Sequence, residues 1–266
     1  MADREVLLVD SHCHLGELER RGLPAPQVLQ GARDAGVRTV VTSADNLIES
    51  RAGRDLAEAF PEVYFTVGWH PVNRQPPGPA ELDEMRRLLA HPKAVALGEV
   101  GLDYFFREGY QETPAGLQQE IFLGMLELAA ELALPVVIHQ RQAEADLLRV
   151  LDAAPAVSGI LHCFSGGVTL AAEAAARGLY CSFAGNVTFK SARGLQEAAK
   201  LVPSELLLVE TDAPFLAPEP HRGQVCVPAM VRATAQWLAV LRGECLESIA
   251  EATSRNADQA LGLAQA

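Results

Sequence analysis

The chain has 266 residues, of which 49% are hydrophobic, and a formal net charge of −12 at pH 7. This length and apolar content can bury a large core, and they suit one α/β barrel that spans residues 1–266. The negative charge excludes a broad nucleic-acid-binding face, which needs a basic stripe. It does not exclude a small phosphate ester, because bound metal ions would add local positive charge.

The sequence also limits the cellular setting. No apolar stretch approaches the roughly 20 residues that span a bilayer, and no basic segment precedes a long apolar one as in a signal peptide. The five cysteines are odd in number and scattered, without Cys-X-X-Cys pairs. We therefore expect a cytoplasmic protein with reduced thiols, no membrane contact and no obligate protein partner.

Strand-like and helix-like segments alternate along the whole chain. Eight short runs rich in Val, Leu or Ile predict strands that are buried on both faces. In chain order these runs are Val6–Ser11, Val37–Thr42, Val63–Gly68, Val95–Glu99, Val136–His139, Gly159–His162, Leu179–Phe183 and Leu206–Thr211. Helical patterns such as Leu117–Leu132 lie between them, and a ninth helical stretch lies near the C-terminus. The alternation predicts a (β/α)8 TIM barrel with an extra C-terminal helical segment; the alternative is an open doubly wound sheet.

A His-X-His sequence follows the first apolar run. Side chains alternate along an extended strand, so His12 and His14 are predicted to face the same way and Cys13 the opposite way. The same argument predicts that Cys163, next to His162, turns away as a small buried thiol.

Polar residues recur at the ends of the later strands. His70 lies just beyond the third strand, Glu99, His139 and His162 end the fourth, fifth and sixth, and Asp212 follows the eighth. Barrel enzymes assemble their active sites at this carboxyl edge.

These residues can form a metal centre. Four histidines (His12, His14, His139 and His162) and two carboxylates can hold two divalent ions if one carboxylate bridges them, and Glu99 is our candidate bridge. Such a mixed nitrogen and oxygen set accepts Mg, Mn or Zn. Two ions can share a water, lower its pKa and clamp both oxygens of a displacement at phosphorus. Asp212 would bind one metal and take the proton from the water.

The chain resembles the TatD family of metal-dependent deoxyribonucleases, within a larger superfamily of barrel metal hydrolases. The resemblance rests on eight segments in family order: Asp10–Leu15, Gly68–Pro71, Gly98–Tyr104, Leu134–His139, His162–Gly166, Val187–Lys190, Glu210–Pro214 and Pro220–Gly223. It implies metal positions at His12, His14, Glu99, His139, His162 and Asp212. It also implies metal-dependent phosphodiester hydrolysis that trims single-stranded DNA from the 3′ end, with the choice between DNA and RNA left open.

Three positions depart from the family pattern. Gly16 stands where the family usually has Asp, Gln140 stands where a small residue is common, and Val225–Pro228 replaces a more polar segment. None of these changes removes a metal position. The last one follows strand eight, so it bears on substrate preference more than on reaction type.

Several loop residues are candidates for substrate contact. His70 can bind a phosphate oxygen or fix the loop before Pro71, while Arg141, Lys190 and Arg222 can contact phosphate or remain solvated charges. Aromatic residues after strand four can stack on bases or pack over the barrel mouth. Glu210 has the strand parity of Asp212, which predicts a position behind the metal ligands or a structural hydrogen bond.

Two other functions stay open at this stage. Relatives in the superfamily hydrolyse amides, lactones and aminoacyl esters, but many of them bridge their ions with a modified lysine at strand four, where this chain has Glu99. That difference favours a phosphoesterase. A metal-bound scaffold without activity is the other alternative, and the complete set of ligands argues against it.

Overall fold

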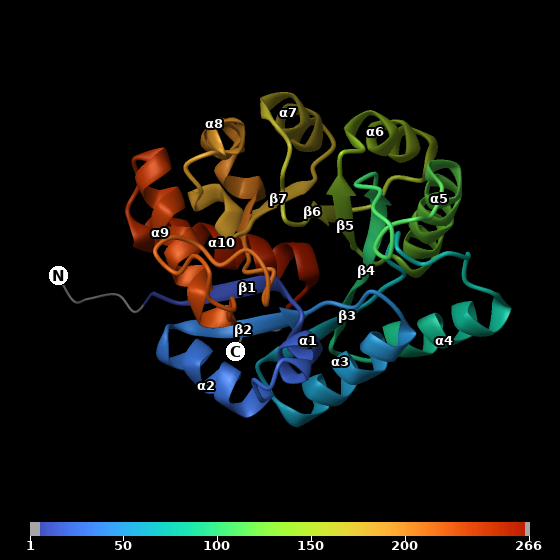
Figure 1. Cartoon of the computed structure of the whole chain (residues 1–266), viewed down its shortest axis with the longest axis horizontal. Coiled ribbons are helices and arrows are strands. Elements are labelled where there is room, and N and C mark those ends of the chain that lie inside the picture. The colour runs from blue at the N-terminus through green and yellow to red at the C-terminus, as the bar shows by residue number, and fades with distance from the viewer. Residues whose placement is uncertain (1–5, 264–266) are drawn as a thin grey trace.

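Eight parallel strands form one sheet in chain order, with helices around its outside (Figure 1). The computed structural model describes residues 6–263. The strands are β1 (Leu8–Cys13), β2 (Val37–Thr42), β3 (Val63–Val67), β4 (Ala94–Asp103), β5 (Val136–Arg141), β6 (Gly159–Leu161), β7 (Tyr180–Phe183) and β8 (Leu207–Val209). The chain beyond β8 meets β1, since Asp212 N–H donates to His12 O at 2.9 Å and His14 N–H donates to Ala213 O at 2.7 Å. The predicted (β/α)8 barrel is confirmed, and the open doubly wound sheet is wrong.

The helices follow the predicted alternation. They are α1 (Leu15–Arg20), α2 (Ala25–Asp34), α3 (Leu47–Ala59), α4 (Pro79–Leu89), α5 (Ala115–Leu132), α6 (Glu144–Ala153), α7 (Val168–Ala176), α8 (Arg193–Leu201), α9 (Val231–Arg242) and α10 (Leu246–Leu261). Three short 3-10 helices add to them: η1 (Gly185–Thr188), η2 (Ser204–Leu206) and η3 (Pro228–Met230). The last two helices, α9 and α10, form the expected C-terminal helical segment. Among residues 6–263, no helix is both long and apolar enough to cross a membrane.

Two hydrophobic clusters lie on opposite faces of the strands. Val40 and Val136 belong to the larger cluster, which packs against the surrounding helices, whereas their neighbours Val41 and Val137 belong to the smaller one. The smaller cluster also contains Ala257, Ala260, Leu261 and Leu263 from α10 and the residues after it. The smaller cluster thus joins inward-facing strand residues to α10. This helix covers the amino end of the barrel and leaves the carboxyl end open for the site.

Several strand boundaries differ from those predicted by the apolar runs. β1 begins at Leu8 and continues to Cys13, β4 continues to Asp103 and β5 continues to Arg141. Glu99 and His139 therefore lie inside strands instead of ending them. The register shifts within β1 and β4, between Asp10 and Cys13 and between Leu97 and Val100. The strands continue through polar residues that line the site. A pattern of apolar residues cannot predict where such strands end.

Candidate metal centre

Glu99 is the middle of a compact cluster at the carboxyl end of the barrel. One oxygen, Oε1, lies 3.1 Å from His12 Nε2 and 3.2 Å from His14 Nε2. The other, Oε2, lies 2.8 Å from His162 Nε2 and 3.4 Å from His139 Nδ1. The two oxygens of one carboxylate thus face two different pairs of imidazoles, which is the arrangement of a bridging ligand.

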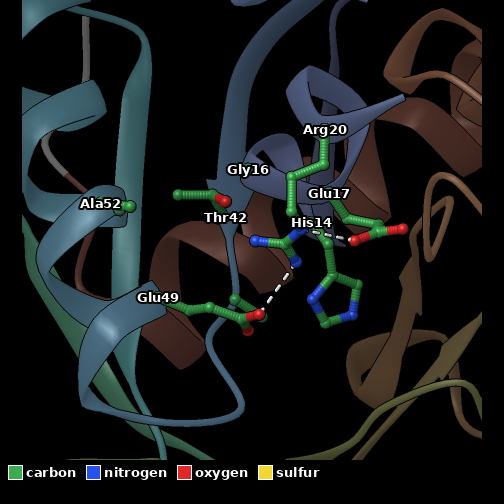
Figure 2. A pocket seen from close by; sticks show the side chains of 9 residues that line it. His14, Gly16, Glu17, Arg20, Thr42, Glu49 and Ala52 are labelled. Atoms are coloured by element: carbon green, nitrogen blue, oxygen red, sulfur yellow. Dashed lines mark hydrogen bonds and ion pairs between the residues drawn. The ribbon is translucent and has the colours of Figure 1, made fainter. Parts of the chain in front are cut away.

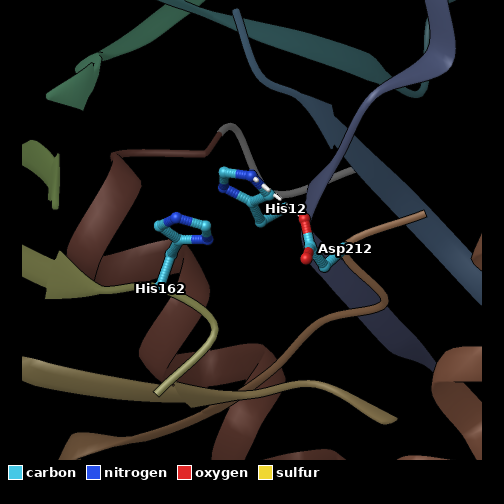
Figure 3. A group of neighbouring side chains, drawn as sticks. All are labelled: His12, His162 and Asp212. Carbon is cyan, nitrogen blue, oxygen red and sulfur yellow. Dashed lines mark ion pairs between the residues drawn. The ribbon is translucent and has the colours of Figure 1, made fainter. Parts of the chain in front are cut away.

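Asp212 completes the side of the cluster formed by β1. Its Oδ1 lies 3.5 Å from His14 Nε2 and 3.9 Å from His12 Nε2. Figure 3 shows Asp212 beside His12, with the His162 ring on the far side of His12. The rings of His12 and His162 stack with centroids 4.0 Å apart. The structure therefore brings together all six residues that the resemblance implied as metal positions.

A buried carboxylate in β1 fixes the segment that carries Asp212. Asp10 accepts hydrogen bonds from Thr211 N at 2.8 Å and from Thr211 Oγ1 at 2.6 Å. These bonds tie the residue before Asp212 to the first strand, across the seam of the barrel. The ligand supplied after β8 is thereby held against the His-X-His ligands of β1.

His70 joins the cluster from the loop after β3. Its Nε2 lies 3.9 Å from Glu99 Oε2, and its ring centroid lies 4.5 Å from that of His139. Burial, followed by the charge of His139, lowers the pKa of His70 to about 3, so the ring is neutral. Its Nδ1 accepts a hydrogen bond from Val72 N at 3.1 Å, which leaves the ring proton on Nε2. His70 therefore fixes its loop and also points a donor into the site, which suits an anionic oxygen better than a cation.

The cluster has the chemistry of a divalent-cation site. The Nε2 atoms of His12 and His14 are 3.4 Å apart, and His139 Nδ1 is 3.2 Å from His162 Nε2. Converging nitrogen lone pairs need a cation or a proton between them. Burial would raise the pKa of Glu99, but His162 and His12 lower it well below the usual range, so this carboxylate is ionised. The mixed nitrogen and oxygen donors fit Mg, Mn or Zn.

Further residues orient the ligands from behind. Ser43 Oγ lies 3.0 Å from His12 Nδ1, and Asp103 Oδ2 lies 3.2 Å from His139 Nε2. Tyr110 Oη donates to the same Asp103 oxygen at 3.1 Å. Such contacts fix the rotation of a ligating imidazole and raise its basicity. Sequence reasoning assigned this role to none of the three residues. Asp103 lies within the family segment Gly98–Tyr104, Tyr110 is one of the aromatic residues after strand four that were considered for base stacking, and nothing in the pattern marks Ser43.

Glu210 lies behind the cluster, although the strand parity used to predict this does not apply: β8 ends at Val209, and Asp212 has a left-handed backbone (φ 54°). Its Oε1 accepts a hydrogen bond from Cys163 N at 2.6 Å and lies 3.5 Å from His162 Nδ1. Glu210 therefore combines the two alternatives, since it makes a structural hydrogen bond and also faces a candidate ligand.

The two cysteines beside site histidines differ. Cys13 is fully buried in the larger cluster, as predicted. The prediction for Cys163 is wrong: β6 ends at Leu161, and Cys163 is half-buried with a left-handed backbone (φ 43°). Strand alternation does not apply to such a residue. Burial and the nearby Asp212 carboxylate raise the pKa of the Cys163 thiol well above its usual value, so the thiol stays protonated.

The three candidate phosphate-binding cations lie outside the cluster. Arg141 Cζ is 3.8 Å from the centroid of the Phe105 ring, and Arg222 Cζ is 3.6 Å from that of Phe189. Lys190 is exposed. Within residues 6–263 none of these cations forms a salt bridge, so their charges are available to a ligand at the surface.

A small hollow opens beside His14 at Gly16, one of the positions that departs from the family pattern (Figure 2). Arg20 crosses it and donates to Glu17 at 2.8 Å and to Glu49 at 2.9 Å. A Cβ added at Gly16 would meet only Arg20, at 3.9 Å. The glycine therefore leaves space next to a candidate ligand without disturbing the ligand itself.

The chain is similar to known metal-dependent hydrolases and nucleases. The family model described as TatD related DNase matches residues 9–262. The uncharacterized metal-dependent hydrolase YcfH of Escherichia coli (strain K12) is 41% identical over 255 residues, which cover 94% of each chain. The 3′-5′ ssDNA/RNA exonuclease TatD of Citrobacter rodentium is 34% identical over 245 residues, which cover 89% of this chain and 91% of the relative. The crystal structure of YjjV, a TatD homologue from E. coli K12, superposes with a TM-score of 0.86 at 26% identity, covering 98% of this chain and 100% of YjjV.

Proposed function

The chain belongs to the TatD related DNase family and is a metal-dependent hydrolase, and from this we propose that it removes nucleotides stepwise from the 3′ end of single-stranded nucleic acid. The observation that carries the proposal is Glu99, whose two oxygens face separate imidazole pairs. The name of the C. rodentium relative supports the 3′ polarity and a DNA or RNA substrate.

We propose two ions, between which the candidate ligands are divided. His12, His14 and Asp212 would hold one, His139 and His162 would hold the other, and Glu99 would bind both. Divalent ions bound there would lower the pKa of a water molecule and would supply positive charge for the attacking and leaving oxygens at phosphorus.

Side chains of the protein accept the proton of the water and bind the phosphate oxygens. Burial would raise the pKa of Asp212, but the hydrogen bond with His14 and the charge of His12 lower it below the usual value. The Asp212 carboxylate is therefore ionised and can accept the proton of the attacking water. His70 offers its Nε2 proton to a phosphate oxygen. Arg141 at the end of β5, and Lys190 and Arg222 in the loops after β7 and β8, contact the following phosphates.

The shape and charge of the molecule favour a strand end. Because α10 covers the amino end of the barrel, a substrate reaches the cluster only from the carboxyl side. The net charge of −12 repels a long duplex, whereas a single end needs only the local charge of the ions and the loop cations. We place this activity in the cytoplasm, in keeping with five free cysteines.

The test is an end-labelled single-stranded ladder, run with a 3′-blocked oligonucleotide, a blunt duplex and a circular single strand. We expect stepwise shortening of the free 3′ end alone, abolished by a chelator and restored by Mg or Mn. Efficient cutting of the circle would contradict end trimming and leave the metal chemistry standing. Faster turnover of an aminoacyl ester or amide than of any oligonucleotide would instead support the alternative hydrolase.

A further inference from the structure

An exposed aromatic side chain lies directly beside the metal cluster. Phe215 is 45% exposed, although Pro214 and Ala217 on either side of it are buried. Its ring centroid lies 6.1 Å from that of His14, with the two rings inclined at 72°. Because the ring is partly in solvent and adjoins a candidate ligand, a substrate at the cluster can reach it.

The backbone that carries this ring is held firmly. Phe215 N–H donates to Asp212 O at 2.9 Å, and Cys226 N–H donates to Pro214 O at 3.1 Å. On the other side Gly185 lies so close that an added Cβ would be 2.0 Å from Leu216 O. The ring is therefore preset relative to Asp212, and a flat ligand that stacks on it immobilises few further groups.

Arg21 lies over the Phe215 ring. Its Cζ lies 5.2 Å from the Phe215 centroid, and its Nε donates to Glu17 Oε1 at 3.0 Å. The pair thus presents an aromatic ring together with a guanidinium group. Nucleobases stack on aromatic rings, and arginine adds a cation–π contribution and attraction for phosphate.

We propose that Phe215, supported by Arg21, is the stacking platform for a nucleobase that flanks the scissile phosphate. This rests on the proposed function, because it assumes a nucleic-acid strand end at the cluster. Every base has a π face, so such a platform accepts all four bases. It also selects single-stranded ends, since a base held in a duplex must first leave its partner and its stack.

The first test combines a protein change with a substrate change. Phe215→Ala should lower kcat/KM for a single-stranded oligonucleotide roughly tenfold or more, and Phe215→Tyr should retain most activity. The substrate is then made without the base on one side or the other of the scissile bond, using a tetrahydrofuran residue. For one of these two base-free substrates, kcat/KM of Phe215→Ala should be within about twofold of the wild-type value, because the base that would stack on the ring is absent. A twofold difference is the usual error when independent changes are compared.

Val240→Ala is the control. Val240 is also an exposed apolar side chain, on α9, and it makes none of the contacts described for the cluster. Whatever factor this change introduces must be the same for intact and base-free substrates. If Phe215→Ala likewise costs the same on every substrate, Phe215 has only a structural role and the proposal is overturned.

A second measurement does not depend on turnover. An oligonucleotide with 2-aminopurine at the flanking positions and a phosphorothioate at the scissile linkage is mixed with the metal-loaded enzyme. Stacking on Phe215 should change the 2-aminopurine fluorescence with wild type and Phe215→Tyr, and not with Phe215→Ala. If wild type cleaves no oligonucleotide, the proposed function fails, while this signal still decides whether Phe215 stacks bases. An equal signal from all three proteins would overturn the platform.

Discussion

At the scale of single residues, Glu99 is the position that tolerates replacement least, because its negative charge interacts with several imidazole rings at once. Its oxygens approach four ring nitrogens within 2.8 to 3.4 Å. A glutamine has the same shape, but it carries no charge and presents only one carbonyl oxygen. The site therefore depends on the carboxylate itself and not only on a side chain of that size.

We expect Glu99→Gln to lower metal content and turnover together. Losing a bridging charge removes several kcal/mol of stabilisation in the transition state, which corresponds to at least about a hundredfold in rate. Elemental analysis, oligonucleotide turnover and circular dichroism measure the metal content, the activity and the fold. Glu84→Gln, which changes a surface carboxylate paired with Arg51, is the control. Near-normal turnover of Glu99→Gln would show that Glu99 does not bridge two ions.

Tyr110 offers a subtler test, because it acts on the cluster through Asp103. Burial and Asp103 raise the pKa of Tyr110 to about 12, so its hydroxyl keeps the proton that it donates. Tyr110→Phe should weaken Mn binding by roughly three- to tenfold, less than the 10- to 100-fold typical when a direct partner of a ligand is lost. Tyr104→Phe is the control, because the Tyr104 hydroxyl donates to Asp146 and not to Asp103. Calorimetric Mn titration that gives equal affinities for the two variants would exclude this role.

At the scale of elements, the apolar runs were sufficient to predict the barrel and the edge on which the ligands gather. Each run reports a strand buried on both faces, and eight of them in alternation with helices favour one closed arrangement. They could not predict that β4 continues through Glu99 to Asp103, because its last residues are held by sheet hydrogen bonds with β5 while they line a polar site. Nor could strand parity place Cys163, whose left-handed backbone lies beyond the end of β6.

Backbone contacts with the segments that follow β2 and β3 hold Glu99 in place within β4, and Gly68 makes this close approach possible. Glu99 N–H donates to Ala44 O at 2.9 Å, and Trp69 N–H donates to Glu99 O at 3.0 Å. A Cβ at Gly68 would lie 1.8 Å from Ala44 O and 2.5 Å from Glu99 N. These contacts are with backbone atoms, which cannot rotate away as a flexible side chain would.

Gly68→Ala should therefore destabilise the fold by about 1–3 kcal/mol, as overpacking commonly does, and should also displace Glu99 and reduce metal content. Gly124→Ala is the matched control, since it lies within α5 with no atom within 4 Å of the added Cβ. Replacing a helical glycine there should stabilise the protein by about 0.5–1 kcal/mol. Urea unfolding measures both changes, and a neutral Gly68→Ala would show that the strand ends can separate without cost.

At the scale of the whole molecule, the two ends of the barrel differ: the carboxyl end carries the ionisable side chains of the site, and the amino end is filled by apolar side chains. α10 and the smaller hydrophobic cluster cover one end, and the candidate ligands at the other end are drawn from strands and loops far apart in the sequence. Cations bound there would link β1, β4, β5 and the segments after β6 and β8. Metal binding should therefore stabilise the entire barrel and not only the loops around the cluster.

We expect addition of Mn or Mg to raise the unfolding temperature of chelator-treated protein. One site at a free metal concentration of 100 times Kd adds about 2.7 kcal/mol, provided that the unfolded chain does not bind the ion. For a chain of 266 residues, that free energy corresponds to a rise of roughly 5–10 °C. The rise should reverse with chelator and should be much smaller in Glu99→Gln, because the charge that serves both imidazole pairs is gone. Calorimetry across a metal titration measures it, and a midpoint that does not depend on metal concentration would exclude the cluster as the cation site of the folded protein.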